Sequence, residues 1–224
     1  MGKTYEISVG SRASNPGDRN SIGGRPLLDA DQRWPICGCG TRMTLYFQVQ
    51  VPSDIRYFGG DQLLVFQCPL DSDCTFPTDR QLAAGFWDAE FDGRTPFWRI
   101  LLQSKGIPAE TADPILRPTE LTLRPSNDED DGRPLYGFKI GGAPYWVQDP
   151  ESYRCACGTD LVFLAQVPED FPFSDYLADP DDQDGDDNTY PAALDDGLLL
   201  GNVIYIVACP SRCNPAAAWP ICQN

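Results

Sequence analysis

A short cysteine motif that occurs twice constrains the fold of this chain more than any other feature. Cys37-Gly-Cys39-Gly40-Thr41 returns as Cys155-Ala-Cys157-Gly158-Thr159. A Gly-Gly-x-Pro element precedes each copy, at residues 23–26 and 141–144, and an apolar segment that ends in Gln-Val follows each one. The same separation of 118 residues relates all three features. The sequence therefore predicts a structural unit that has been duplicated.

Each copy also contains a second cysteine pair, placed after a further apolar segment. The eight cysteines form two sets of four: Cys37, Cys39, Cys68 and Cys74, then Cys155, Cys157, Cys209 and Cys213. In each set one pair follows a turn and the other pair ends a predicted hairpin strand, so we expect the pairs to meet at one end of a hairpin. Four thiolates arranged in this way suit a tetrahedral structural zinc ion. We predict up to two structural zinc ions per chain.

Three other states of these cysteines stay open at this stage. The first pair of each set is Cys-x-Cys, whereas zinc ribbons normally have Cys-x-x-Cys. Reduced thiols can pack as small apolar side chains, oxidised pairs can form disulfides, and four cysteines can hold an iron–sulfur cluster. The ninth cysteine, Cys222, is expected to be a plain thiol.

The N-terminal residues lack the apolar segment of a signal peptide, and no apolar run is long enough to cross a bilayer. We therefore expect a cytoplasmic protein, a compartment where thiols stay reduced and paired cysteines bind metal more often than they form disulfides.

The fold class predicted from the sequence is mainly β, with little helix. Twenty-one prolines and twenty glycines favour short strands joined by many turns. Strands are predicted at residues 5–9, 43–51, 62–67, 97–103, 120–124, 138–140, 161–167 and 202–208, and one short helix at 80–88. We expect two pseudo-symmetric halves, residues 1–126 and 127–224, each with its cysteine-bound hairpin. The second half carries an acidic insertion with Asp179–Asp187 at its centre.

The net charge of −16 restricts the classes of binding partner. Nucleic acids and anionic membranes are disfavoured because both attract cations. A basic protein or peptide is compatible, although such a charge can also serve solubility alone. The acidic run at 179–187 fails the register of an EF-hand, so we expect a mobile acidic loop that could dock a basic partner.

The chain contains no histidine, which excludes Ser-His-Asp and Cys-His catalysis and histidine-ligated zinc. A hydrolase that uses paired carboxylates stays open. Gln48 and Gln166 end equivalent apolar segments, where they could bind a ligand or satisfy backbone groups. Trp146 could serve as a ligand platform or as a packing residue.

The second half resembles the bacterial YwqG-like proteins and their eukaryotic relatives, the programmed-cell-death-2 proteins. The resemblance rests on Gly141-Gly142-x-Pro144-x-Trp146, Cys155-x-Cys157-Gly158, Phe163-Leu164-x-Gln166 and Cys209-Pro210-x-x-Cys213. It implies a duplicated, β-rich, non-enzymatic protein. The eukaryotic relatives act as chaperones of a basic ribosomal protein, and the family is also linked to RNA processing and to bacterial toxin–immunity neighbourhoods.

The sequence thus favours a non-enzymatic zinc-binding module that interacts with proteins, with a chaperone-like role toward a basic partner. The alternatives are an immunity or self-resistance protein that binds a toxin or small molecule, and a carboxylate-dependent hydrolase.

Overall fold

The computed structural model describes residues 2–70, 80–88, 96–127, 129–130, 133–177 and 197–224. Strands form nearly all of the regular structure in these ranges, where the only helices are two short 3-10 turns, η1 (Phe173–Tyr176) and η3 (Leu198–Gly201). None of the helices in this part of the chain is long and apolar enough to span a membrane. The mainly β fold predicted from the sequence is confirmed.

Ten strands form one antiparallel sheet. From edge to edge they are β14 (Ala218–Gln223), β13 (Val203–Ala208), β12 (Val162–Val167), β11 (Lys139–Gly141), β1 (Thr4–Ala13), β8 (Thr119–Ser126), β2 (Ser21–Ile22), β4 (Thr44–Gln50), β5 (Gln62–Gln67) and β6 (Trp98–Gln103). Two further sheets have two strands each: β3 (Leu27–Leu28) with β7 (Ile107–Pro108), and β9 (Glu129–Asp130) with β10 (Arg133–Pro134).

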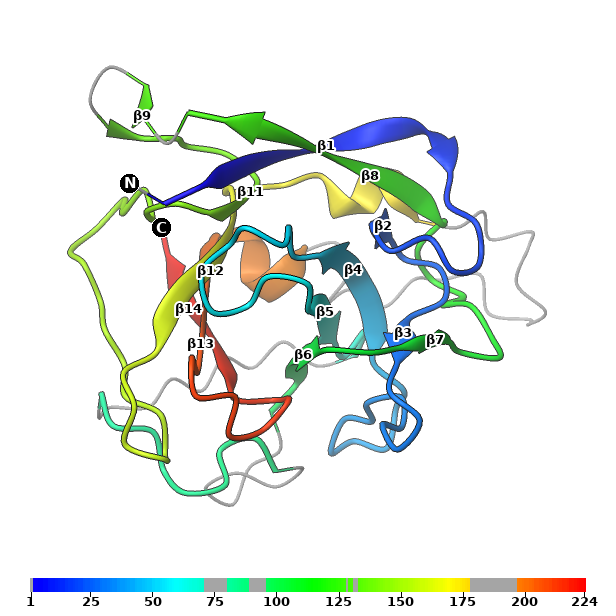
Figure 1. The fold of residues 1–224 in the computed structure, drawn as a ribbon. Coiled ribbons are helices and arrows are strands. Elements are labelled where there is room, and N and C mark those ends of the chain that lie inside the picture. Colours follow the sequence, from blue (N-terminus) through cyan, green and yellow to red (C-terminus); the bar gives the residue numbers. More distant parts are fainter. Residues whose placement is uncertain (1, 71–79, 89–95, 128, 131–132, 178–196) are drawn as a thin grey trace.

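The large sheet curls into a nearly closed barrel, so that its edge strands β6 and β14 come together (Figure 1). The Leu102 N–H donates to the Pro215 carbonyl across this seam at 2.8 Å. The rings of Trp98 and Trp219 pack edge to face there, with centroids 5.1 Å apart. The strands β4, β5 and β13 are buried along almost their whole length, and their apolar side chains supply much of the core.

The two halves repeat each other strand by strand. The group β2-β4-β5-β6 corresponds to β11-β12-β13-β14, in the same order outward from the centre of the sheet. The equivalence extends to irregularities: β4 has a register shift between Leu45 and Phe47, and β12 has one between Phe163 and Ala165. These positions are again 118 residues apart, so the predicted duplication is confirmed at the level of single β-bulges.

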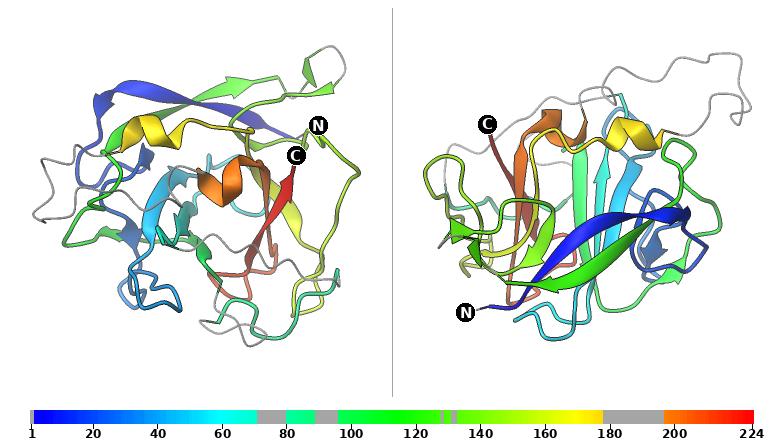
Figure 2. Two further views of the ribbon diagram at one scale, coloured as in Figure 1. Left: turned by 180° about the vertical axis from the view of Figure 1, so that it is seen from behind. Right: turned by 90° about the horizontal axis from the view of Figure 1, so that it is seen from above.

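The central strands β1 and β8 join the two groups by an exchange. β1 precedes the first Gly-Gly element but pairs with β11 of the second group, whereas β8 precedes the second Gly-Gly element but pairs with β2 of the first. Figure 2 shows this pair running obliquely across the strands of the two groups. The barrel is therefore continuous across the duplication.

The predicted helix at 80–88 is wrong. Residues 80–82 instead run beside Arg154, with the Leu82 N–H donating to the Arg154 carbonyl at 2.9 Å. Gly85 has a φ of +74°, which interrupts any helix, and tight turns close from Phe86 to Ala83 and from Asp88 to Gly85. The acidic run predicted to be a mobile loop, 179–187, lies outside the described residues.

Candidate metal centre

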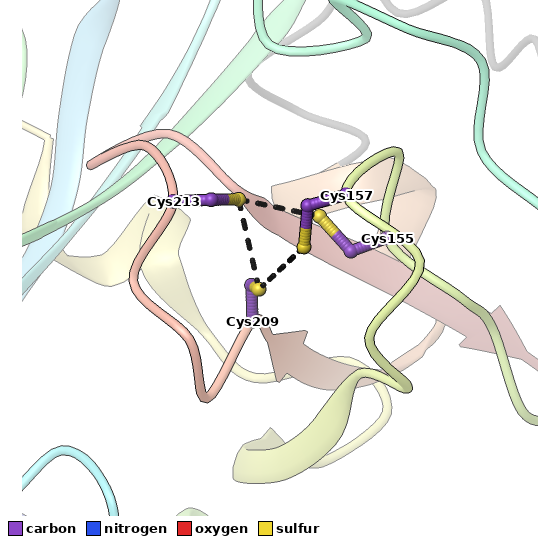
Figure 3. A group of neighbouring side chains, drawn as sticks. All are labelled: Cys155, Cys157, Cys209 and Cys213. Atoms are coloured by element: carbon purple, nitrogen blue, oxygen red, sulfur yellow. Dashed lines mark hydrogen bonds between the residues drawn. The ribbon is translucent and has the colours of Figure 1, made fainter.

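The second cysteine set comes together as predicted. The side chains of Cys155 and Cys157 point from one turn toward those of Cys209 and Cys213 on the β13–β14 connection (Figure 3). All four Sγ atoms lie within 4.8 Å of one another. Three of the separations are 3.5 Å, between Cys155 and Cys213, and 3.6 Å, from Cys209 to Cys157 and to Cys213. A tetrahedron with metal–sulfur bonds of about 2.3 Å has edges of about 3.8 Å, so these sulfurs nearly span a zinc coordination sphere.

The Cys-x-Cys-Gly-Thr sequence determines the turn that presents the first pair. The Cys155 N–H donates to the Thr159 carbonyl and the Gly158 N–H donates to the Cys155 carbonyl, both at 2.8 Å. Gly158 closes the turn at a φ of +88°, a conformation that favours glycine. Cys155 is thereby buried while Cys157 faces solvent. The single spacer residue is thus sufficient for both thiols to reach one point.

A second tight turn presents the other pair. β13 ends at Ala208, and the Cys209 N–H then donates to the Ala217 carbonyl at 2.9 Å. The Arg212 N–H returns to the Cys209 carbonyl at 3.0 Å, and Arg212 has a φ of +50°. This left-handed residue reverses the chain, so that Cys213 points back toward Cys209.

The first cysteine set has the same local structure. The Cys37 N–H donates to the Thr41 carbonyl at 2.8 Å and the Gly40 N–H donates to the Cys37 carbonyl at 2.9 Å. The Sγ atoms of Cys37, Cys39 and Cys68 lie within 4.8 Å of one another. Burial raises the pKa of the Cys68 thiol to about 12, and the Leu70 N–H, which donates to the Cys68 sulfur at 3.4 Å, opposes this shift in part. Cys74, the predicted fourth member, lies outside the described residues.

The seven cysteines of the two sets that lie in the described ranges are all free thiols. Their closest approaches of 3.5–3.6 Å are far longer than a disulfide bond of about 2.05 Å. The disulfide alternative is therefore excluded for these cysteines in this structure. Reduced thiols that only pack as apolar side chains do not need to bring three or four sulfur atoms within 4.8 Å of one another. Cys222, outside both sets, is partly buried in β14.

Protonation differs sharply between the inner and outer thiols of each turn. The hydrogen bond of Cys157 with the Thr159 hydroxyl, 3.4 Å long, lowers the pKa of this exposed thiol to about 6. Thr41 lowers the pKa of Cys39 to about 7 in the same way. Burial raises the pKa of Cys155 to about 11. Bound metal would need the buried thiols as thiolates too, so metal uptake would release protons.

A segment of the first half supports the cysteine turn of the second half. The Gln81 side chain donates to the Cys155 carbonyl at 2.8 Å, and the Arg154 N–H donates to the Arg80 carbonyl at 2.8 Å. Residues 80–82 therefore hold the turn that carries Cys155, and a change in this turn would reach both halves of the barrel.

The three predicted binding residues lie away from the cysteines. Gln48 and Gln166 are buried in β4 and β12, where their amides hydrogen-bond to the backbone. Trp146 is half-buried and packs against Tyr205, with ring centroids 4.4 Å apart. Each makes intramolecular contacts, and a role in binding a ligand stays a prediction for all three.

A polar group that was not predicted from the sequence lies beside the second cysteine set. Arg212, between two cysteines of that set, forms an ion pair of 3.0 Å with the buried Asp61 of the β4–β5 loop. Gln103, at the end of β6, lies in the wall of the same region. Gln103 and Gln223 end equivalent strands, 120 residues apart, and this repeat could have drawn attention to Gln103.

Comparison with protein-family models and with curated proteins found no match to this chain.

Proposed function

We propose that this chain is a non-enzymatic zinc-binding module that acts in the cytoplasm through protein interaction, with a chaperone-like role toward a basic partner. The observation that carries the zinc assignment is the convergence of Cys155, Cys157, Cys209 and Cys213 within 4.8 Å. A set of four sulfur ligands is typical of structural zinc.

The donor set argues for a structural rather than a catalytic ion. A catalytic zinc keeps one coordination position for water or substrate, whereas four protein thiolates fill the tetrahedron. The sulfurs also come from two turns that are distant in sequence, at 155–157 and 209–213. Metal binding would therefore tie the two turns together and contribute directly to the stability of the fold.

Charge supports a basic partner. The chain has 33 acidic residues against 17 basic ones, and its net charge is −16. A charge of this size attracts a cationic protein over distances beyond direct contact and raises the association rate. The resemblance to the YwqG-like family and to chaperones of a basic ribosomal protein adds support of the same kind.

The partner proposal is tested by measuring the aggregation of purified basic ribosomal proteins by light scattering, with and without the zinc-loaded chain. We expect suppression of aggregation at low salt that weakens as salt is added, because salt screens the attraction. An acidic protein of similar size serves as the control and should aggregate as it does alone. The proposal would be contradicted if the chain did not suppress the aggregation of any basic client, or if the suppression did not change with salt concentration.

A further inference from the structure

A short segment of the first half fills a strand edge beside the second cysteine set. Arg154, the residue before Cys155, forms a parallel bridge with Gln81. Its N–H donates to the Arg80 carbonyl at 2.8 Å, and its carbonyl accepts from the Leu82 N–H at 2.9 Å. The Gln81 side chain also donates to the Cys155 carbonyl at 2.8 Å. The chain thus adds one extended segment to the outer edge of this turn through backbone hydrogen bonds.

The equivalent edge of the first cysteine turn is open in the described part of the chain. Ile36 lies 118 residues before Arg154 and forms the same antiparallel bridge, with Arg42 in place of Asp160. In both bridges the hydrogen bonds come from the flanking residues, so the N–H and carbonyl of the central residue point out of the turn. Those of Arg154 are taken by residues 80–82, whereas those of Ile36 have no partner among the described residues.

The side chains around the two edges also differ. Ile36 is 60% exposed, and Leu70, two residues after the third cysteine of its set, is 59% exposed. The residues at these positions of the second copy are Arg154 and Ser211, and each forms a polar pair of 3.0 Å on the surface of the chain. The copy with the open edge therefore displays apolar side chains, and the copy with the filled edge displays polar ones.

The filled edge of the second copy indicates what the open edge can bind. A strand edge with unpaired backbone groups accepts an extended peptide as an added strand. Directly paired residues share one face of a sheet, so the peptide residue opposite Ile36 should be apolar where Gln81 lies opposite Arg154. The net charge of −16 favours basic residues on either side of it, and Arg80 is such a residue in the segment that fills the second edge.

We propose that the edge at Ile36 binds an extended, basic segment of a partner protein as an added parallel strand. The Ile36 N–H donates to one peptide carbonyl, the Ile36 carbonyl accepts from the peptide N–H two residues later, and an apolar residue between them packs on the Ile36 side chain. This surface rests on the protein-interaction function proposed above and assigns it a place in the fold.

The test is a heteronuclear NMR titration of the purified full chain with the capped peptide Lys-Arg-Val-Arg-Lys. We expect a saturable shift of the Ile36 amide signal that exceeds the shift of the Arg154 signal. Two comparison peptides have the same charge: one is N-methylated at the residue after valine, and one has glutamine in place of valine. We expect both to bind at least about fivefold more weakly, because one lacks the backbone donor and the other lacks the apolar contact.

Two outcomes of the titration overturn the proposal. Equal affinity for all three peptides would show that only charge attracts them. A shift confined to Arg154 would show that the peptide displaces residues 80–82 and does not bind at Ile36.

Matched variants locate the site. Ile36→Pro removes the outward N–H, and Ile36→Gln removes the apolar side chain but keeps the backbone; we expect each to weaken peptide binding by about fivefold or more. Ile107→Gln changes another exposed isoleucine, 67% exposed, and should leave the affinity within about twofold. If Ile36→Pro does not fold, Ile36→Gln decides alone, and an unchanged affinity there overturns the proposal.

The aggregation assay described above separates this surface from the function on which it rests. A chain that protects basic ribosomal proteins but does not bind the valine peptide overturns the Ile36 surface and leaves the chaperone-like function standing. A chain that does neither overturns both. Loss of protection in Ile36→Gln, with protection retained in Ile107→Gln, supports the proposal that clients bind at this edge.

Discussion

Gln48 and Gln166 make the same hydrogen bond in the two copies of the duplicated unit. The Oε1 of Gln48 accepts from the Leu27 N–H at 3.0 Å, and that of Gln166 accepts from the Tyr145 N–H at 2.9 Å. Both donors and both acceptors are 118 residues apart. The amide ties the segment after the Gly-Gly element to the strand that follows the cysteine turn. The two glutamines therefore act as internal connectors of the unit.

Replacement of these glutamines should destabilise the fold unequally. The Nε2 of Gln48 also donates to the Arg25 carbonyl at 2.9 Å and the Ser21 hydroxyl at 3.1 Å, whereas that of Gln166 makes a longer bond of 3.4 Å to Gly137. We expect Gln48→Met to lower the free energy of unfolding by about 2–4 kcal/mol and Gln166→Met by less, because fewer buried groups lose a partner. Urea denaturation measures both.

The control for this pair is Gln32→Met. The Gln32 side chain donates to the carbonyl of the next residue, Arg33, and its replacement should change stability by less than about 0.5 kcal/mol. A Gln48→Met variant as stable as this control would show that the amide is not a connector.

Replacement by alanine should cost very different amounts of stability at Gly158 and at Gly23, two glycines of the repeated motifs. Gly158, in the cysteine turn, has a φ of +88° with open space where a Cβ would lie, so Gly158→Ala should cost about 1–2 kcal/mol through backbone strain alone. Gly23, in the Gly-Gly element, has a φ of +55°, and an added Cβ would lie 2.5 Å from the Leu116 carbonyl oxygen. Gly23→Ala should therefore cost clearly more. Thermal unfolding of the two variants gives the comparison, and equal losses would contradict this packing.

Asp113 should give the stability a defined pH dependence. Its carboxylate is 5% exposed and accepts from the N–H groups of Leu45, Ile115 and Leu116 at 2.8, 2.8 and 3.3 Å. Burial nevertheless raises the pKa of Asp113. A raised folded-state pKa means that ionisation costs stability above that pKa, and that the cost disappears as pH falls below the unfolded-state value of about 3.9.

The Asp113→Asn variant isolates this effect. The asparagine has an amide NH2 group in place of one carboxylate oxygen, so a backbone N–H loses its acceptor. We expect the free energy of unfolding to fall by about 1–3 kcal/mol at neutral pH. The stability advantage of the native chain over the variant should grow as pH falls toward 4, because only the native chain is relieved of a buried charge. Asp160→Asn, at an exposed ion pair, is the control and should show no such trend. An advantage that shrinks with falling pH would contradict a raised pKa of Asp113 in the folded chain.

The apolar runs of the sequence were enough to predict most strands, and the spacing of the cysteine pairs was enough to predict that the pairs of each set lie close together. The apolar run of β13 and the glutamine-ended runs of β4 and β12 are strong signals within single segments. β14 was not predicted, and it contains Pro220, a residue that strands rarely contain. Among the described strands β14 lies at the edge of the sheet and pairs with β13, so a residue without an N–H is tolerated there.

The exchange of β1 and β8 could not be predicted in the same way. β1 pairs with β11, and β8 pairs with β2. Because β2 and β11 are equivalent strands of the two copies, the local sequence of β1 or β8 does not show which of them will be its partner. The ion pair of Asp61 with Arg212 depends on the same closure of the barrel, since the two residues are brought together only when β6 approaches β14.

Loss of one predicted ligand should destabilise the whole barrel. Cys213→Ser removes a sulfur that lies 3.5–3.6 Å from two others, and metal binding contributes directly to folding. We expect a fall in Tm of more than about 10 °C, which corresponds to a few kcal/mol for a chain of this size. Cys222→Ser, at a cysteine outside both sets, is the matched control and should retain the native metal content. Equal Tm values for the two variants would count against a metal at this site.

Metal content per chain tests directly whether the two cysteine sets bind metal. Elemental analysis of the purified protein, combined with thiol titration before and after unfolding, counts both the ions and the nine cysteines. We expect close to two zinc ions per chain, with the eight cysteines of the two sets protected in the folded protein and released by chelator and denaturant. Cys213→Ser should lose one of the ions. No bound metal, with nine thiols reacting once the chain is unfolded without chelator, would show that neither cysteine set holds an ion.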